Sequence, residues 1–210
     1  YPSNREVLLQ TVKAQGKTLV ALSGDSHNAW FANLTTLAGE MRKAGDRHVA
    51  IGAVRVDGSV VRADDTFDAL VNPGIRIPGV STGFHGITDE MVADAGSPAE
   101  VVAQFADYAV DSVLVAHHTA FDLGFLAPAA QAAGVSLEPL ALDTMLLSAA
   151  LEPDPEARHG LDYVCERYGV EVFGRHTALG DALATAEVLV RMIPRLAERG
   201  IVTLGQAREA

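Results

Sequence analysis

The amino-acid sequence predicts an α/β domain in which helices cover a mixed sheet. Two observations support this fold class: an alternating stretch from residue 48 that is typical of antiparallel strands, and a later apolar strand followed by successive helical segments. With 210 residues, of which 49% are hydrophobic and 20% charged, the chain is long enough to bury one sizeable core.

The first elements in chain order are a helix, a turn and a strand. Val7, Leu8 and Val12 recur at helical spacing within residues 4–15, and Gly16 is a stop signal. Residues 18–22 form a short β-rich run. The segment after Gly24 has weak periodicity, and no element is assigned there.

The central part of the chain predicts a β-meander that leads into a helix. Residues 48–56 alternate, the Asp57-Gly58 pair is a strong hairpin turn, and residues 59–73 supply the returning strands. Ser97 and Glu100 then predict a capping box, with a proline between them at the first helical position.

The second half alternates between apolar and helical segments. An apolar strand is predicted at 112–116. Helices are expected at 119–133, 143–151, 161–168 and 179–199.

Charge and composition limit the kinds of partner. The formal net charge of -11 gives no broad basic surface, so a nucleic acid would have to be held locally or through cations. The single cysteine, Cys165, predicts a buried thiol and excludes a disulfide within the chain, which fits a reducing, cytoplasmic location. Neither a membrane span nor a signal peptide is expected, and the start at Tyr1 predicts a piece of a longer protein.

Three ionisable residues stand at the edges of the predicted elements. Asp122 follows the end of the apolar strand, where ligand crevices form in α/β sheets. Asp181 interrupts the start of an alanine-rich helix, and His176 lies five residues before it. If His176 and Asp181 shared one unbroken helix, their side chains would point about 140° apart. We therefore expect His176 in the loop just before the first turn of the helix that contains Asp181.

Clustered carboxylates of this kind suit phosphodiester hydrolysis. They hold hard divalent cations that bridge the phosphate and activate a water, and a neighbouring histidine takes the proton of that water. Taken singly, each residue has an ordinary alternative, because an aspartate at a helix start is often a cap and a histidine there is often structural.

Two motifs resemble the DEDDh family of DnaQ-like exonucleases. VAHHTAFDLGFL looks like the second motif of that family, and HTALGDALATAEVL like the third. The segments DRHVAIGAVRVDGSVV, FDALVNPGIRIP, HGITDEMV and LDTMLLS resemble the body of proofreading exonuclease domains, so that the resemblance covers about residues 42–210.

This resemblance implies a fold, a cofactor and a substrate. The fold would be RNase H-like, with two Mg²⁺ or Mn²⁺ ions, and the reaction would release nucleoside 5′-monophosphates from a 3′ end of single-stranded DNA or RNA. Asp122 and Asp181 would be metal ligands, His176 the general base, and His118 and Phe121 substrate contacts. A polymerase would be a conceivable partner.

The chain departs from this family at two places. His118 stands where family members usually carry asparagine. The first motif, Asp-x-Glu at the end of a strand, is missing, because its two carboxylates would fall near Leu34 and Thr36.

The N-terminal forty residues instead resemble a fragment of PhoD-like alkaline phosphatases and phosphodiesterases. In those enzymes a Gly-Asp-x-His element supplies metal ligands, which corresponds here to Asp25 and His27. The resemblance therefore divides the chain into a PhoD-like segment at 1–40 and an exonuclease domain at 41–210.

One hypothesis joins the two parts. The strand at 18–22 would take the place of the missing first strand, and Asp25 would stand at the metal site, with His27 in place of the glutamate. Three functions follow from these resemblances: a metal-dependent 3′-to-5′ exonuclease, whose activity loss of the first motif would reduce; an inactive module that binds 3′ ends; and a PhoD-like phosphatase or phosphodiesterase.

Overall fold

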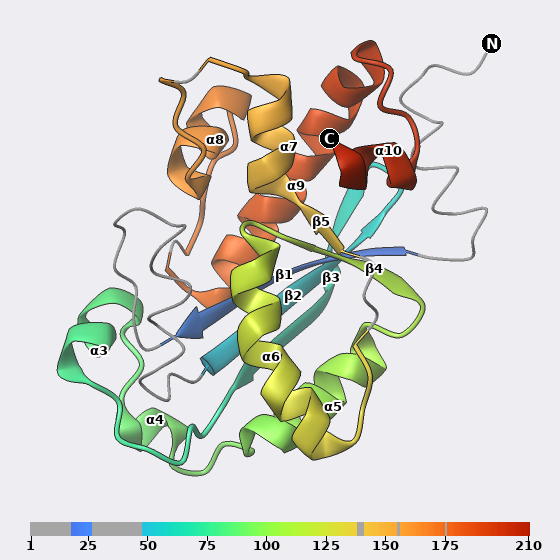
Figure 1. Ribbon diagram of the computed structural model, residues 1–210. Helices are drawn as coiled ribbons and strands as arrows, with labels where there is room; N and C mark the ends of the chain where they lie inside the picture. The colour runs from blue at the N-terminus through green and yellow to red at the C-terminus, as the bar shows by residue number, and fades with distance from the viewer. Residues whose placement is uncertain (1–17, 27–47, 138–140, 155, 175) are drawn as a thin grey trace.

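The structure of the chain is a computed structural model that describes residues 18–26, 48–137, 141–154, 156–174 and 176–210 (Figure 1). The predicted helix at 4–15, and also His27, Leu34 and Thr36, lie outside the described residues.

The core of the fold is a mixed sheet of five strands in the order β3-β2-β1-β4-β5. The strands are β1 (Thr18–Ser26), β2 (His48–Asp57), β3 (Val60–Leu70), β4 (Ser112–Ala116) and β5 (Ala141–Asp143). The central strand β1 pairs antiparallel with β2 and parallel with β4. β2 pairs antiparallel with β3, which confirms the predicted meander, and the N-terminal strand β1 is the middle strand of the sheet.

After β3, helices alternate with β4 and β5 and then continue to the end of the chain. They are α3 (Gly79–His85), α4 (Asp89–Val92), α5 (Pro98–Tyr108), α6 (Thr119–Ala133), α7 (Thr144–Leu151), α8 (Leu161–Tyr168), α9 (Ala178–Glu198) and α10 (Leu204–Glu209). The predicted capping box of α5 is present, since the Ser97 side chain accepts from the Glu100 amide and the Glu100 carboxylate accepts from the Ser97 amide.

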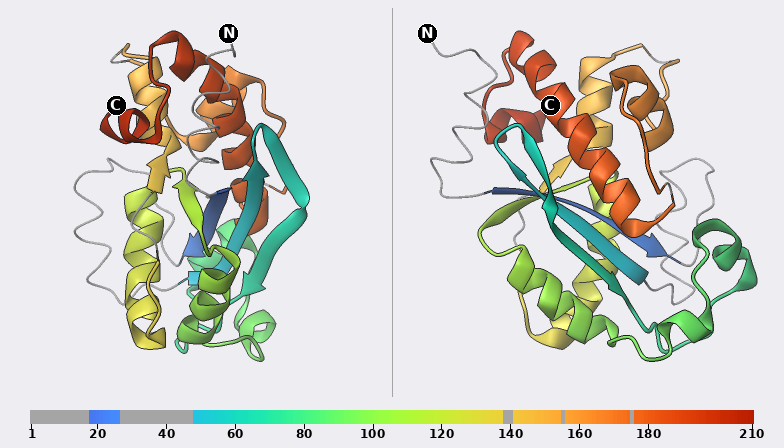
Figure 2. Two further views of the ribbon diagram at one scale, coloured as in Figure 1. Left: turned by 90° about the vertical axis from the view of Figure 1, so that its right-hand side faces the viewer. Right: turned by 180° about the vertical axis from the view of Figure 1, so that it is seen from behind.

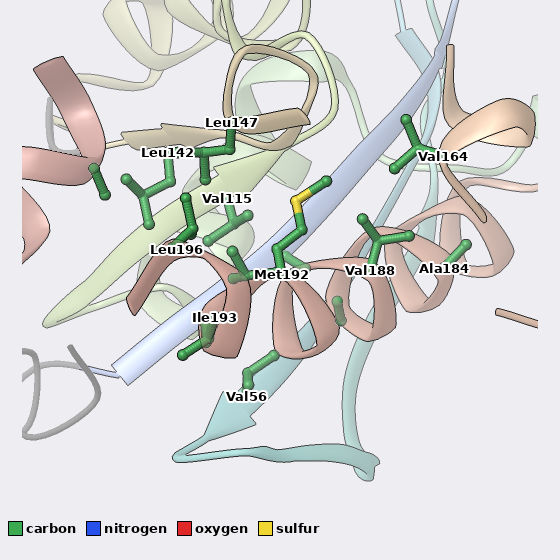
Figure 3. Packing of buried hydrophobic residues seen from close by; sticks show 14 of the residues in the cluster. Val56, Val115, Leu142, Leu147, Val164, Ala184, Val188, Met192, Ile193 and Leu196 are labelled. Carbon is green, nitrogen blue, oxygen red and sulfur yellow. The ribbon is translucent and has the colours of Figure 1, made fainter. Parts of the chain in front are cut away.

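Helices cover both faces of the sheet (Figure 2). On one face α9 crosses the strands, and alternate residues of β2 and β4 such as Val54 and Val115 pack beneath it. Figure 3 shows Val188, Met192 and Leu196 of α9 pointing into this cluster. On the opposite face α5 and α6 cover the other set of alternate residues. The α/β fold class is confirmed.

Four short elements were missed from the sequence. They are α3, α4, β5 and α10, and none is longer than seven residues. Cys165 is buried in the α9 side of the core, as expected. Within the described part of the chain, no helix is long and apolar enough to cross a membrane.

Candidate active site

The candidate site lies at the edge of the sheet where β1 and β4 end. These strands run parallel, with Ala21 opposite Val115, so both carboxyl ends point to the same edge. Helix α6 starts just after β4, and α9 starts beside the arrowhead of β1 (Figure 1). Ligand crevices in α/β sheets form at such edges.

The first turn of α9 rests directly on the sheet at a glycine of β2. A Cβ added to Gly52 would lie 2.2 Å from the backbone carbon of Ala178 and 2.2 Å from the nitrogen of Leu179. Gly52 pairs with Ser23 across the β1–β2 ladder. This close approach therefore places the start of α9 next to the end of the central strand.

The loop before α9 folds back onto the first turn of the helix. Thr177 caps α9, because its hydroxyl accepts from the Gly180 amide at 3.1 Å and donates to the Gly174 carbonyl at 2.6 Å. Only glycine fits at position 180, because a Cβ there would lie 2.0 Å from the carbonyl oxygen of Gly174.

His176 occupies the loop just before α9, as the sequence predicted. Its backbone amide donates to Oδ1 of Asp181 at 3.3 Å, and its side chain is exposed to solvent. Asp181 lies in the first turn of α9 and is half-buried. The carboxylate of Asp181 and the loop that carries His176 are thus in direct contact.

Asp122 lies in the first turn of α6 and is 5% exposed. Burial of a carboxylate is costly unless it has partners, and Asp122 does interact with another group of the protein. His118 precedes the helix, and its ring stacks on Phe121 with centroids 5.9 Å apart. Phe121 in turn meets Phe125 edge-on at 4.9 Å. An aromatic row therefore runs along α6 beside Asp122.

Two residues of the candidate site have a strained backbone. His118, the N-cap residue of α6, has φ 79°. His176, which directly precedes the N-cap residue of α9, has φ 67°. This left-handed conformation costs a residue with a side chain about 1–2 kcal/mol. Such strain persists where surrounding contacts hold it, and it gathers at functional sites.

His117, the residue before His118, anchors the turn between β4 and α6. Nε2 of His117 donates to the His159 carbonyl at 2.8 Å, and Nδ1 lies 2.9 Å from the hydroxyl of the buried Thr144. His159 itself contacts the buried Ser148 hydroxyl through Nδ1 at 3.0 Å, and Arg167 donates to the same hydroxyl at 2.9 Å. These bonds connect the turn to α7 and α8.

This network predicts a loss of stability on mild acidification. Burial lowers the pKa of His159 from its usual 6.5, and the positive charge of Arg167 lowers it further. The unfolded chain then takes up a proton that the folded chain resists, so stability is complete above the unfolded pKa and falls as the pH drops below it. We expect the melting temperature to decrease from about pH 7.5 to about pH 5.5, with a smaller decrease in His159→Gln. Equal decreases in both proteins would show that His159 does not contribute.

The described residues do not by themselves form a metal site. Asp122 and Asp181 are carboxylates, the donors that Mg²⁺ and Mn²⁺ prefer, and both lie in first turns of helices. Among the described side chains, however, no group of three or more His, Cys, Asp or Glu is placed to hold a metal ion. The donor type fits a divalent cation, and a complete set needs at least one further ligand.

The backbone of Asp25 lies at the edge where such a ligand is needed. Asp25 pairs with Ala50 near the end of β1, and the register shifts between Asp25 and Ser26. The side chain of Asp25 lies outside the described part of the structure, so its metal role remains a prediction.

Comparison with known proteins decides the family. The family model described as "Exonuclease" (RNase_T) matches residues 34–189. The chain belongs to this exonuclease family. A relative of this exonuclease domain is a DNA polymerase III subunit epsilon-like protein of Rhodobacter capsulatus, 44% identical over 173 residues, which are 81% of the chain and 24% of the relative. Another is a PolC-type DNA polymerase III of Caldanaerobacter subterraneus subsp. tengcongensis, 37% identical over 77% of the chain and 11% of the relative.

Solved structures show the same fold. Exonuclease X in complex with 5′ overhanging duplex DNA matches with a TM-score of 0.67 at 20% identity, over 91% of the chain and 98% of that structure. The nuclease domain of 3′hExo, a DEDDh family member bound to rAMP, matches with a TM-score of 0.70 at 16% identity, over 89% and 94%. The predicted RNase H-like fold of the exonuclease domain is therefore confirmed.

One described strand of the N-terminal segment, β1, lies inside the sheet and pairs on both of its sides. The match to the exonuclease family model begins at residue 34. The PhoD-like resemblance of residues 1–40 finds no support in these comparisons. The boundary at residue 40 stays a prediction.

Sequence reasoning missed the contacts that hold the start of α6. Thr119 donates through its hydroxyl to the Leu142 carbonyl at 2.9 Å and through its amide to Oδ2 of Asp143 at 2.8 Å. The available signal was Asp143 at the start of α7. An aspartate there predicts a cap for α7, but it does not predict a bond to α6.

Proposed function

We propose that the chain is a metal-dependent 3′-to-5′ exonuclease domain that hydrolyses phosphodiester bonds at the 3′ end of single-stranded DNA or RNA. The observation that carries this proposal is the position of two acidic helix starts. Asp122 and Asp181 lie in the first turns of α6 and α9, and these helices begin at the edge where β1 and β4 end.

Two Mg²⁺ or Mn²⁺ ions would be held by Asp122 and Asp181, together with Asp25 from the end of β1. When bound, such ions polarise the phosphate and lower the pKa of an attacking water. Carboxylates and water suit both cations.

The remaining residues handle the substrate and the proton. The exposed imidazole of His176 takes the proton of the attacking water. His118 and Phe121 offer ring faces to the terminal base, which suits a protein of net charge -11 that lacks a broad basic surface.

The relatives also suggest a setting for this reaction. The chain spans about a quarter of the epsilon-like relative and about a ninth of the PolC-type polymerase. We therefore propose that the domain acts beside a DNA polymerase, on the 3′ end that the polymerase extends.

The direct test is cleavage of a 5′-labelled single-stranded oligonucleotide with Mn²⁺. We expect a ladder that shortens from the 3′ end, and none with Asp181→Asn, because the amide cannot replace the anionic ligand. Asp107→Asn is a matched control, since Asp107 is exposed on α5. Cleavage that starts inside the strand, or an equal rate in Asp181→Asn, would contradict the proposal.

A second candidate is a module that binds 3′ ends without hydrolysis. The observation that favours it is the incomplete donor set among the described side chains. A folded chain that binds the oligonucleotide, but leaves it intact at saturating Mn²⁺, would establish this alternative.

A further inference from the structure

One carboxylate, that of Asp143, joins the starts of two helices. Oδ1 accepts from the His118 amide at 3.2 Å, and Oδ2 accepts from the Thr119 amide at 2.8 Å. The same Oδ1 accepts from the amides of Met145 and Leu146 at 2.9 and 3.3 Å. Asp143 thus caps its own helix α7 and also holds the first residues of α6.

Both oxygens of this carboxylate accept from backbone. Three of the four amides share Oδ1, and the fourth, that of Thr119, binds Oδ2. Bonds from amides to an ionised acceptor are stronger than neutral ones, and the positive ends of two helix dipoles add to them. Asp143 therefore holds the backbone at the starts of two helices.

The residues that Asp143 holds belong to the candidate site. His118 has a left-handed backbone and stacks on Phe121, and Asp122 lies one residue further along the first turn. The Thr119 hydroxyl, bound to the Leu142 carbonyl, is a second attachment to the same β5–α7 junction. The start of α6 is thus fixed from the junction between β5 and α7.

We propose that Asp143 is a positioning residue that sets the start of α6 and thereby places Asp122 and the His118–Phe121 pair in the active site. This inference rests on the proposed function for its consequence on binding. Its structural part, the control of the start of α6 by Asp143, is independent of whether the chain hydrolyses nucleic acid.

The variant Asp143→Asn separates positioning from helix capping. Its remaining oxygen still caps α7, because asparagine is as good a cap as aspartate. Its NH₂ group, however, faces the Thr119 amide in place of Oδ2, so two donors oppose each other. We expect a folded protein in which the start of α6 is displaced. Asp143→Ala should lose both the cap of α7 and the attachment of the start of α6.

Three measurements follow on the unaltered chain, Asp143→Asn and Asp154→Asn. Asp154 is the matched control, because it is exposed and its Oδ1 accepts from the backbone amide of Glu156, two residues further along the chain. We expect Asp143→Asn to weaken Mn²⁺ binding, measured by electron paramagnetic resonance, by about 10- to 100-fold, as is typical when a partner of metal ligands is lost. Oligonucleotide binding should weaken in parallel.

The third measurement needs neither metal nor substrate. The stacked Phe121 ring should give the ring protons of His118 a ring-current shift, which Phe121→Leu removes. Asp143→Asn should reduce this shift, and Asp154→Asn should not. An unchanged shift in a folded Asp143→Asn protein would overturn the inference. A reduced shift in a chain that binds neither Mn²⁺ nor oligonucleotide would refute the proposed function alone.

Discussion

Replacement of Asp25 by alanine is expected to abolish Mn²⁺-dependent cleavage by this domain. Asp25 lies at the end of the central strand β1, opposite Ala50, at the edge where α6 and α9 begin. Asp122 and Asp181 are too few to hold two cations, and loss of one member of a catalytic set costs on the order of 10⁴-fold in rate. The measurement is the single-turnover rate on a single-stranded oligonucleotide.

The matched control is Asp107→Ala, which removes an exposed aspartate from the surface of α5. This variant should cleave at the unaltered rate. If Asp25→Ala remains as active as Asp107→Ala, the strand at 18–26 completes the sheet without completing the metal site. The circular dichroism spectrum and melting temperature of the same proteins separate loss of the ligand from loss of the fold.

Replacement of Gly52 by alanine is expected to give the largest loss of stability. The new Cβ would lie 2.2 Å from backbone atoms of Ala178 and Leu179, a distance that neither backbone can accept without moving. We expect the free energy of unfolding to fall by about 3 kcal/mol, the upper end for overpacked cores. Because α9 carries Asp181, cleavage should fall as well, even at temperatures where the variant is folded.

Gly83→Ala is the control for this substitution. Gly83 lies inside α3, and a Cβ there meets nothing within 4 Å. Alanine in a helix is more stable than glycine by about 0.5–1 kcal/mol, so this variant should unfold at the same or a higher denaturant concentration. A Gly52→Ala protein as stable as Gly83→Ala would show that α9 does not rest on β2 as described.

The long elements could be predicted because their signals are local. The strand at 48–56, the capping box of α5 and the helix from 119 to 133 all follow from periodicity and caps. The short elements could not, since α4 has four residues and β5 three, too few for a period to be recognised. The central place of β1 was a hypothesis about pairing, which the sheet order confirms.

The candidate site was predictable only in part for a similar reason. The position of His176 before α9 follows from helical geometry and is confirmed, whereas its role as a base stays a prediction. The approach of α9 to Gly52 and the bonds of Asp143 to α6 depend on residues far apart in the chain. No local pattern encodes such contacts, because they exist only after the layers have packed.

The pairing of β1 with β4 has a consequence for how the protein is made. Thr18 lies opposite Ser112, so the middle of the sheet closes only when a strand more than ninety residues later has been synthesised. Pairings of such long range slow folding. Asp181 arrives later still, so a nascent or truncated chain that ends before α9 contains all five strands but lacks one of the acidic residues of the candidate site. Synthesis itself therefore delays any nuclease activity until nearly the whole domain has been translated.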